Sequence, residues 1–410
     1  MNDLLRVCLL GAGQTVAVNR AGGMASKLLQ TLGYRAPSPA EEQQFLAGSR
    51  ADRDERTTLV PAAVLSADPL ISYSGIVPKA PLGVATLSGT CLAARNAWFL
   101  ISPTWSIETD EAASKLRECA VLHRIANRHH RLIFICNTPE EAAIMQKQDE
   151  AAFYYNKTAN VLQTLFRPLP GARAIYDAVY NAQLSPWKRH ELSMGVERCA
   201  FLFYRDGSSP DAAASQAAIM LRHAAVPGHV FINPLDENQR PVRLSPRRVN
   251  EFLNQASVGL CLSRIEGAMF ASTEYLLSGL PIVSTPSIGG RHVYYDEEYC
   301  WTVPPDPASV AAAVDALKDK RIPRSYVRKK TLRRLDVDRE RFLNLVNAIL
   351  EECQSDSRLA MPWPFKKQVT MEWLAAAEAV RRAKEGVVDG FEKKGKVRLP
   401  WYRRLFGRFR

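Results

Sequence analysis

The chain has 410 residues, of which 47% are hydrophobic and 23% are charged, and its formal net charge is +12. This composition is typical of a folded protein with enough chain for two or three domains, and it excludes an intrinsically disordered polypeptide. No run of about 18 apolar residues occurs, and the first residues lack the charged and apolar regions of a signal peptide. We therefore expect neither a membrane-spanning helix nor a cleaved leader.

The spacing of cysteines and histidines argues against a metal site or a disulfide framework. The eight cysteines lie far apart without a C-x-x-C pair, and the seven histidines show no ligand spacing with cysteines or carboxylates. Neither a Gly-x-Ser-x-Gly nor a Walker sequence occurs, which disfavours hydrolases and phosphoryl-transfer enzymes. We predict a protein without a metal site, in a reducing cytoplasm.

The first 70 residues contain two predicted elements and a surface segment. Residues 4–10 form a short apolar run that ends in a glycine-containing turn, the pattern of a first buried strand. We expect a helix over residues 24–32, directly after Gly22 and Gly23. Residues 36–70 contain prolines and a charged cluster, so we expect a surface segment there and no core element.

Strand and helix patterns alternate from residue 96 onward. Strands are predicted at residues 96–101 and 131–136, with a helix at residues 108–128 between them. Thr138 is then the expected N-cap of a further helix that has Pro139 at its first position. This alternation is typical of an α/β domain with a parallel sheet.

A second α/β series follows a segment of two prolines and a glycine at residues 166–171, which we interpret as a domain linker. Its predicted strands and helices lie at residues 199–204, 212–223, 229–233, 245–256 and 258–263. The two series predict two doubly wound domains. Ligands of such sheets bind beyond the carboxyl ends of the strands, so the loop after the strand at 258–263 is the expected site.

Residues 263–290 carry the most informative pattern of the chain. Glu266 and Glu274 stand eight residues apart, with Glu266 at the start of a predicted helix over residues 268–277. A buried strand is predicted at residues 280–284, and a loop that contains Gly-Gly follows it. The start of the helix favours a phosphate, and ionised carboxylates accept hydrogen bonds from sugar or ribose hydroxyls. Two glutamates on a helix are nevertheless most often a solvated face.

The order and spacing of residues 266–290 resemble the nucleotide-sugar-dependent glycosyltransferases of GT-B fold, in particular the retaining group with an E-x7-E motif. The resemblance covers most of residues 132–345. It implies two Rossmann-like domains that face a cleft, with Glu266 and Lys188 as catalytic residues. The implied donor-binding residues are Arg189, Gly267, Ala268, Glu274, Ser287, Gly289 and Gly290. On the acceptor side the resemblance points to Gly22, Gly23, Asn137 and Thr138.

One position departs from the family pattern. The family commonly has an arginine five residues before the lysine that neutralises the donor diphosphate, and here Gln183 stands five residues before Lys188. We expect Arg189, Arg264 or Arg291 to replace the missing charge, or the leaving group to be less well stabilised.

The resemblance implies a hexosyltransferase that is retaining, needs no metal or other cofactor, and has a role in polysaccharide biosynthesis. Its partners would be a nucleotide-sugar donor and a saccharide or lipid-linked acceptor, and not a nucleic acid. Two alternatives stay open: a catalytically weak nucleotide-sugar-binding protein of the same fold, and a GT-B-like sugar-nucleotide epimerase. The predicted domains are residues 1–165 on the acceptor side, residues 166–350 on the donor side, and a helical extension at residues 351–410.

The last 20 residues concentrate positive charge. Residues 391–410 contain eight lysines and arginines against one glutamate, a net charge of +7. In a helix, Trp401, Leu405 and Phe409 share one face, which is typical of a segment that lies on an anionic membrane. A solvated tail is the alternative. We therefore expect a cytoplasmic protein, either free or attached to the inner face of the membrane.

Overall fold

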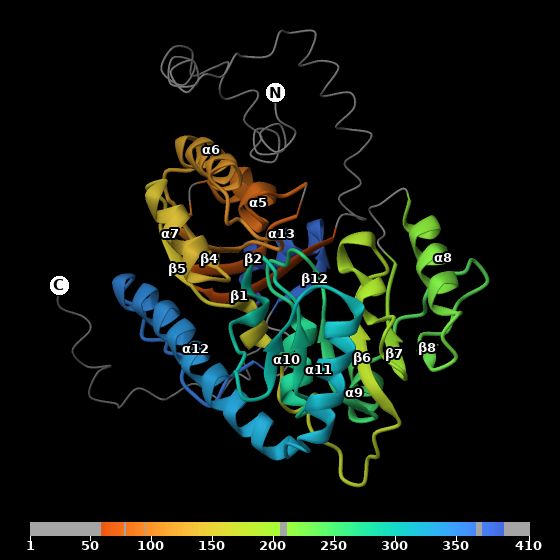
Figure 1. The fold of residues 1–410 in the computed structure, drawn as a ribbon. Helices are drawn as coiled ribbons and strands as arrows, with labels where there is room; N and C mark the ends of the chain where they lie inside the picture. The colour runs from red at the N-terminus through yellow and green to blue at the C-terminus, as the bar shows by residue number, and fades with distance from the viewer. Residues whose placement is uncertain (1–58, 78, 94, 206–210, 366–370, 389–410) are drawn as a thin grey trace, which may run out of the picture.

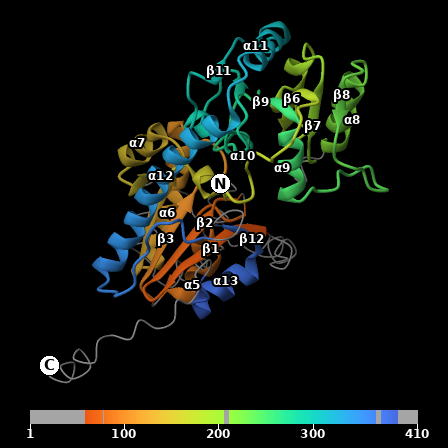
Figure 2. The ribbon, with the colours of Figure 1, turned by 90° about the horizontal axis from the view of Figure 1, so that it is seen from below.

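The structure is a computed structural model, and it describes residues 59–77, 79–93, 95–205, 211–365 and 371–388. Within these residues the chain forms two six-stranded sheets with helices packed around them (Figures 1 and 2). The predicted elements of the first 32 residues, together with Gly22 and Gly23, and the tail at 391–410 lie outside the described residues. In the described part of the chain, every helix is too short or too polar to cross a lipid bilayer.

The first sheet has the strand order β12-β1-β2-β3-β4-β5. Its strands are β1 (Leu59–Ala67), β2 (Leu70–Gly75), β3 (Ala97–Ser102), β4 (His130–Cys136), β5 (Ala152–Tyr154) and β12 (Glu372–Ala375). β2 to β5 are parallel, whereas β1 is antiparallel to both β2 and β12. The helices of this unit are α5 (Val84–Leu92), α6 (Asp110–Ala126), α7 (Pro139–Lys147) and α13 (Ala376–Glu385). We call this unit the first lobe.

The local predictions for residues 96–147 are confirmed. β3, α6 and β4 form where strand, helix and strand are predicted. Thr138 caps α7, because its side-chain oxygen accepts a hydrogen bond from the backbone N–H of Glu141 at 3.0 Å, and Pro139 is the first helical residue. These signals are local in the sequence, so they do not depend on the rest of the fold.

The prediction of a surface segment at residues 36–70 is wrong for its last part. Residues 59–67 form β1, and Val60, Leu65 and Leu70 are at most 3% exposed. β1 lies between β2 and β12, so both of its edges are paired. The charged cluster that motivated the prediction, at residues 50–56, lies outside the described residues.

The second sheet is entirely parallel and has the order β11-β10-β9-β6-β7-β8. Its strands are β6 (Tyr176–Asn181), β7 (Cys199–Leu202), β8 (His229–Phe231), β9 (Ala256–Cys261), β10 (Ile282–Ser284) and β11 (Cys300–Thr302). The helices are α8 (Ala212–His223), α9 (Pro246–Asn254), α10 (Phe270–Leu277) and α11 (Pro307–Asp319). We call this unit the second lobe. The strands and helices predicted at residues 199–263 are confirmed, with ends that differ by a few residues.

A long helix and a returning strand join the lobes. α12 (Arg324–Glu352) has 29 residues and runs from the second lobe to the first (Figures 1 and 2). On α12, Phe342 stacks on Tyr155 with a ring-centroid distance of 4.5 Å, and the buried Arg339 donates to the backbone oxygens of Ala159 and Val161. The chain then reaches β12 and α13, which complete the sheet of the first lobe.

Candidate functional site

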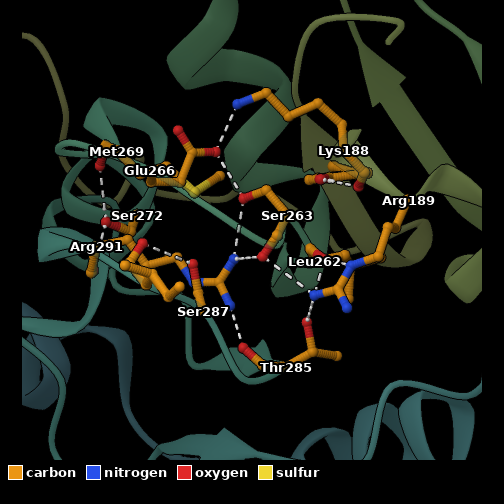
Figure 3. Close-up of polar contacts among 12 residues, drawn as sticks. Lys188, Arg189, Leu262, Ser263, Glu266, Met269, Ser272, Thr285, Ser287 and Arg291 are labelled. Carbon is orange, nitrogen blue, oxygen red and sulfur yellow. Dashed lines mark hydrogen bonds and ion pairs between the residues drawn. The ribbon is translucent and has the colours of Figure 1, made fainter. Parts of the chain in front are cut away.

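The candidate site lies where the carboxyl ends of adjacent parallel strands meet. β9 lies between β6 and β10 in the second sheet, so the loops that follow these three strands emerge at the same edge. The loops carry polar side chains that form one cluster in Figure 3: Lys188, Arg189, Ser263, Glu266, Thr285 and Arg291. Each of these residues except Arg291 has a hydrogen-bond partner in the cluster that is more than 70 residues away in the sequence, so the tertiary fold brings them together.

Lys188 and Glu266 form a largely buried ion pair at the centre of this cluster. Lys188 ends a short 3-10 helix (Pro186–Lys188), and its Nζ lies 2.5 Å from Glu266 Oε1. Ser263 Oγ donates to the same carboxylate oxygen at 2.6 Å. The side chains of Lys188 and Glu266 are 11% and 12% exposed. Among the described residues Glu266 Oε2 has no hydrogen-bond partner, so this oxygen is available to a ligand.

Two arginines hold the loops of the cluster together. Arg189 has a left-handed backbone (φ 52°), and its guanidinium donates to the backbone oxygen of Leu262 at 2.6 Å and to Thr285 Oγ1 at 2.7 Å. Arg291, which is 3% exposed, donates to the backbone oxygen of Ser263 at 2.7 Å and to that of Thr285. Burial, and then the charges of Arg291 and Arg264, lower the pKa of Arg189. Both guanidinium groups therefore serve as fixed positive charges behind the ion pair.

Arg264 differs from these two arginines. Arg264 stands two residues before Glu266 in the sequence, and its side chain is exposed. The Arg264 side chain makes no hydrogen bond or ion pair with the described residues. Its backbone N–H donates to the oxygen of Trp187, the residue before Lys188, at 3.3 Å. Of the three arginines that we expect to replace the charge missing at Gln183, Arg264 is the one in the described part of the chain with an uncommitted guanidinium.

Glu274 has surroundings unlike those of Glu266. It lies within α10, is 7% exposed, and its Oε2 accepts a hydrogen bond from Asn181 Nδ2 at 3.3 Å. Burial raises the pKa of Glu274 to about 7, against the opposing effects of Asn181 and Arg243. Because β6 ends at Asn181, this carboxylate faces the same edge of the sheet as Lys188.

The helix after Glu266 begins later than predicted. α10 starts at Phe270, so Glu266 lies four residues before the helix, in the loop, and not at its first turn. Met269 has an extended backbone (φ −99°, ψ 102°), and Gly267 packs against the first lobe, where an added Cβ would lie 2.7 Å from the carbonyl carbon of Trp105. The loop therefore stays extended over the contact between the lobes, and the prediction of the helix start is wrong by two residues.

The predicted glycine residues lie against the first lobe. An added Cβ at Gly290 would lie 2.6 Å from Asn156 Nδ2 and 2.8 Å from the backbone oxygen of Asn137. Gly289 has φ +96°, and a Cβ there would overlap the backbone oxygen of Glu266. Close approach of the two lobes thus accounts for Gly290, whereas the left-handed backbone and the neighbouring loop of Glu266 account for Gly289. Ala268 and Ser287 lie in the same loops and are partly exposed.

Asn137 and Thr138 lie on the other side of this contact. Both are buried at the end of β4, and the backbone oxygen of Asn137 accepts a hydrogen bond from Asn156 Nδ2 at 3.0 Å. The same amide group donates to the backbone oxygen of Gly290 at 2.7 Å. Thr138 Oγ1 donates to Glu108 Oε1 at 2.9 Å. The structure thus places Asn137 beside the predicted donor loop, whereas the hydroxyl of Thr138 is already engaged.

The sequence interpretation missed several residues of the cluster. Ser263 and Thr285 were not predicted as site residues. Thr285 directly follows the end of β10, and Ser263 lies two residues after the end of β9, so their positions at buried strand ends could have indicated them. Asn156 and Lys157 were also missed, because they follow a three-residue strand without a clear pattern. Among the described residues no three His, Cys, Asp or Glu side chains gather to hold a metal ion, and the prediction of metal independence stays a prediction.

Solved structures with this fold include glycosyltransferases. The chain is similar to a sucrose-phosphate synthase from Thermosynechococcus elongatus with a TM-score of 0.51 and 13% identity, over 68% of this chain and 73% of that one. It is also similar to a glycosyltransferase from Rickettsia africae ESF-5 with a TM-score of 0.50 and 11% identity, over 86% of this chain and 95% of that one. No family model and no curated protein matches the sequence.

These likenesses, together with the two parallel-dominated sheets, confirm the predicted fold class. The chain has the GT-B fold, with two Rossmann-like domains. At identities of 11–13% the likeness concerns the fold, and the chemistry must be argued from the residues of the site.

Proposed function

We propose that this protein is a glycosyltransferase that moves a hexosyl group from a nucleotide-sugar donor to an acceptor. The observation that carries the proposal is the buried pair of Lys188 and Glu266 at the carboxyl edge of the second sheet, 2.5 Å apart and beside the first lobe. Charged groups are rarely buried without a function or a partner, and a largely buried pair at the carboxyl edge of a parallel sheet is a candidate for reaction chemistry.

In this proposal Lys188 stabilises the diphosphate leaving group. Breaking the bond between the sugar and the diphosphate places negative charge on the phosphate oxygens, and a preorganised cation in a water-poor site stabilises that charge. Arg264 supplies a second, exposed cation that replaces the family arginine, whose position Gln183 occupies. Arg189 and Arg291 add positive potential but keep their bonds to the loops.

Glu266 and Glu274 hold the donor at two points. Glu266 Oε2 accepts a hydrogen bond from a sugar hydroxyl, while Oε1 keeps its bond to Ser263. Glu274 accepts from the ribose hydroxyls beside Asn181. We propose retention of the anomeric configuration, and a reaction without metal or other cofactor, on the resemblance of the E-x7-E segment alone.

The partners and location follow from the same proposal. The acceptor is a saccharide or a lipid-linked saccharide that enters from the first lobe, next to Asn137, and the biological role is polysaccharide synthesis. The protein is cytoplasmic, and the basic residues at 391–410 attach it to the inner face of the membrane. The proposed acceptor-side and donor-side domains are residues 1–165 and 166–350, as predicted from the sequence. Residues 351–410 are not purely a helical extension, because β12 and α13 return to the sheet of the first lobe.

A donor screen tests the proposal. UDP-, GDP- and ADP-sugars are added to the purified protein, and the unfolding temperature is measured, because a ligand that binds the native state stabilises it by mass action. The expected result is stabilisation by one nucleotide class, followed by transfer of its sugar to a saccharide acceptor. Absence of both binding and transfer for all three classes would contradict the proposal.

The neutral Gln183 favours one alternative, a protein that binds the nucleotide sugar but turns it over weakly. Calorimetric titration with the nucleoside diphosphate distinguishes it, since binding would persist where transfer is undetectable. An epimerase, the other alternative, would convert the sugar nucleotide in the absence of any acceptor.

A further inference from the structure

Lys157 is a buried cation at the contact between the lobes that has no role in the function proposed above. It starts the 3-10 helix η1 (Lys157–Asn160), which follows β5 and contacts α10 and α12. The residue is 4% exposed, and its Nζ donates to the backbone oxygen of Pro103 in the first lobe. An ammonium group has three N–H donors, and the other two have no hydrogen-bond partner among the described residues. Lysine is rarely buried this deeply unless a charge pairs with it.

The two neighbours of Lys157 both bond to the second lobe. Asn156 Nδ2 donates to the backbone oxygen of Gly290 at 2.7 Å, and Thr158 Oγ1 accepts from Thr273 Oγ1 at 2.8 Å. Thr273 directly precedes Glu274 in α10. Gly290 in turn donates its backbone N–H to the oxygen of Gly267, the residue after Glu266, at 2.9 Å. Lys157 is thus held beside the loop of Glu266 through bonds on both of its sides.

Two carboxylates act on the Lys157 ammonium group, Glu141 from the first lobe and Glu266 from the second. The oxygens of Glu141 already accept from the backbone N–H groups of Ile107 at 3.1 Å and Asn137 at 2.7 Å. Burial lowers the pKa of Lys157 to about 8, and the two carboxylates oppose this effect. The other groups that face these carboxylates are Glu108, near Glu141, and Lys188, Tyr180 and Cys261, near Glu266.

We propose that Lys157 is a positioning residue for sugar transfer, whose ammonium group compensates the charge of the Glu266 carboxylate and keeps it directed into the site when Lys188 turns to the donor diphosphate. Lys188 has one ammonium group, and the function proposed above requires it at the diphosphate. A largely buried carboxylate that loses its paired cation is strongly destabilised, so another cation that acts on it is needed at that moment. The inference rests on the proposed function, because it assigns Lys157 a role in that same site.

The first test is the pH profile of transfer by the wild-type, Lys157→Arg and Lys157→Gln proteins. Lys157 is charged below its pKa, so wild-type activity should fall above about pH 8. The arginine variant should keep its activity to higher pH, because the guanidinium does not lose its proton in this range. The glutamine variant should lose about 10- to 100-fold in kcat at pH 7, the scale of one electrostatic contact in a reaction site. Lys115→Gln is the control, since Lys115 pairs with Glu111 on the surface of the first lobe.

The second test does not depend on turnover. Unfolding is measured for Lys157→Gln, Glu266→Gln and the double variant, to obtain the coupling between the two side chains. We expect the unfolding constant of the double variant to differ at least about threefold from the value that the single variants predict together, since opposite charges that act on each other in a buried region couple. Two results would overturn the role of Lys157. One is an unfolding constant of the double variant within twofold of the value that the single variants predict together; the other is a Lys157→Arg protein whose activity falls at the same high pH as that of the wild type. Failure of the wild type to bind any nucleotide sugar instead overturns the proposed function, and the donor titration detects that separately.

Discussion

Glu266 and Glu274 share one motif but have different partners, and this difference separates their proposed roles. Glu266 forms an ion pair with Lys188 and accepts a hydrogen bond from Ser263, so one of its oxygens is fixed by two donors. Glu274 is covered by protein and accepts one long hydrogen bond from an amide. A carboxylate with a cation suits a position near the reacting sugar, and one with a neutral partner suits a hydroxyl of the ribose.

Replacing Lys188 by methionine should affect both catalysis and stability. The variant leaves Glu266 buried without its cation, and breaking such a pair costs about 3 kcal/mol of unfolding free energy. Transfer should fall about 100-fold or more, because the leaving group loses its cation. Urea unfolding and steady-state kinetics check the two effects, with Lys115→Met as a surface control. The double variant Lys188→Met, Glu266→Gln should regain much of the stability but none of the activity; a full recovery of transfer would remove Lys188 from the site.

Glu274 gives a pH dependence of stability with a defined sign. Its pKa rises from 4.5 to about 7 in the folded protein, so between these values the folded state binds a proton that the unfolded state has lost. Stability from this group is therefore full below about pH 4.5 and is lost as the pH rises through 7. Glu274→Gln should remove this loss, and its unfolding free energy relative to wild type should rise by about 2 kcal/mol between pH 5 and pH 8. Parallel curves for the two proteins would contradict the prediction.

At the scale of elements, the main feature is the contact between the loops that carry Gly267 and Gly290 and the segments that carry Asn137 and Asn156. The loops that follow β9 and β10 approach the end of β4 and η1 so closely that side chains larger than hydrogen do not fit at Gly267 and Gly290. Asn156 joins the two sides by donating to both Asn137 and Gly290. The candidate site therefore depends on how these four loops pack, and not on one element alone.

Gly290→Ala tests this contact. The added methyl group would lie within 2.8 Å of Asn156 and Asn137, so the lobes must shift, at a cost of about 1–3 kcal/mol in unfolding free energy. Donor affinity should also fall, because the loop of Glu266 is displaced. Gly171→Asn is the matched control: Gly171 has φ +74° with nothing within 4 Å of an added Cβ, and asparagine tolerates this backbone region. Equal stability of the two variants would argue against the tight contact.

At the scale of the whole molecule, the last described strand and helix, β12 and α13, complete the sheet of the first lobe, to which the first described strand β1 belongs. β12 pairs with β1, and α13 covers the same strand with the buried side chains of Ala379 and Ala383. An unpaired β1 would expose an edge strand with an apolar face, which invites association between molecules. The C-terminal segment is therefore part of the first lobe in space, although it follows the second lobe in sequence.

Truncation separates this structural role from that of the basic tail. A chain that ends at residue 365 lacks β12 and α13, and should aggregate or show fast amide exchange in β1, as measured by hydrogen exchange and light scattering. A chain that ends at residue 388 keeps both elements and should retain the exchange protection of the full chain in β1. Protection of β1 in the shorter chain would show that the first sheet is stable without β12.

Much of the secondary structure could be predicted because its signals are local. α8 forms at residues 212–223 as predicted, and the cap of α7 follows from four consecutive residues. The failures also have physical reasons. The burial of β1 depends on its pairing with β12, which lies at the other end of the described chain, so a local pattern does not reveal it. The start of α10 depends on the contact of Gly267 with Trp105, which sequence spacing does not reveal either.

The sequence alone determined the alternation of strands and helices, the spacing of Glu266 and Glu274, and the edge of the sheet at which they lie, because each depends on residues close together in the chain. The tertiary structure decided which groups meet there. Lys188 and Glu266 are 78 residues apart, and Asn156 and Gly290 are 134 apart. Such pairs depend on the packing of two sheets and on the return of the chain through α12, and the approach of the lobes buries Lys157 between Pro103 and the bond from Asn156 to Gly290.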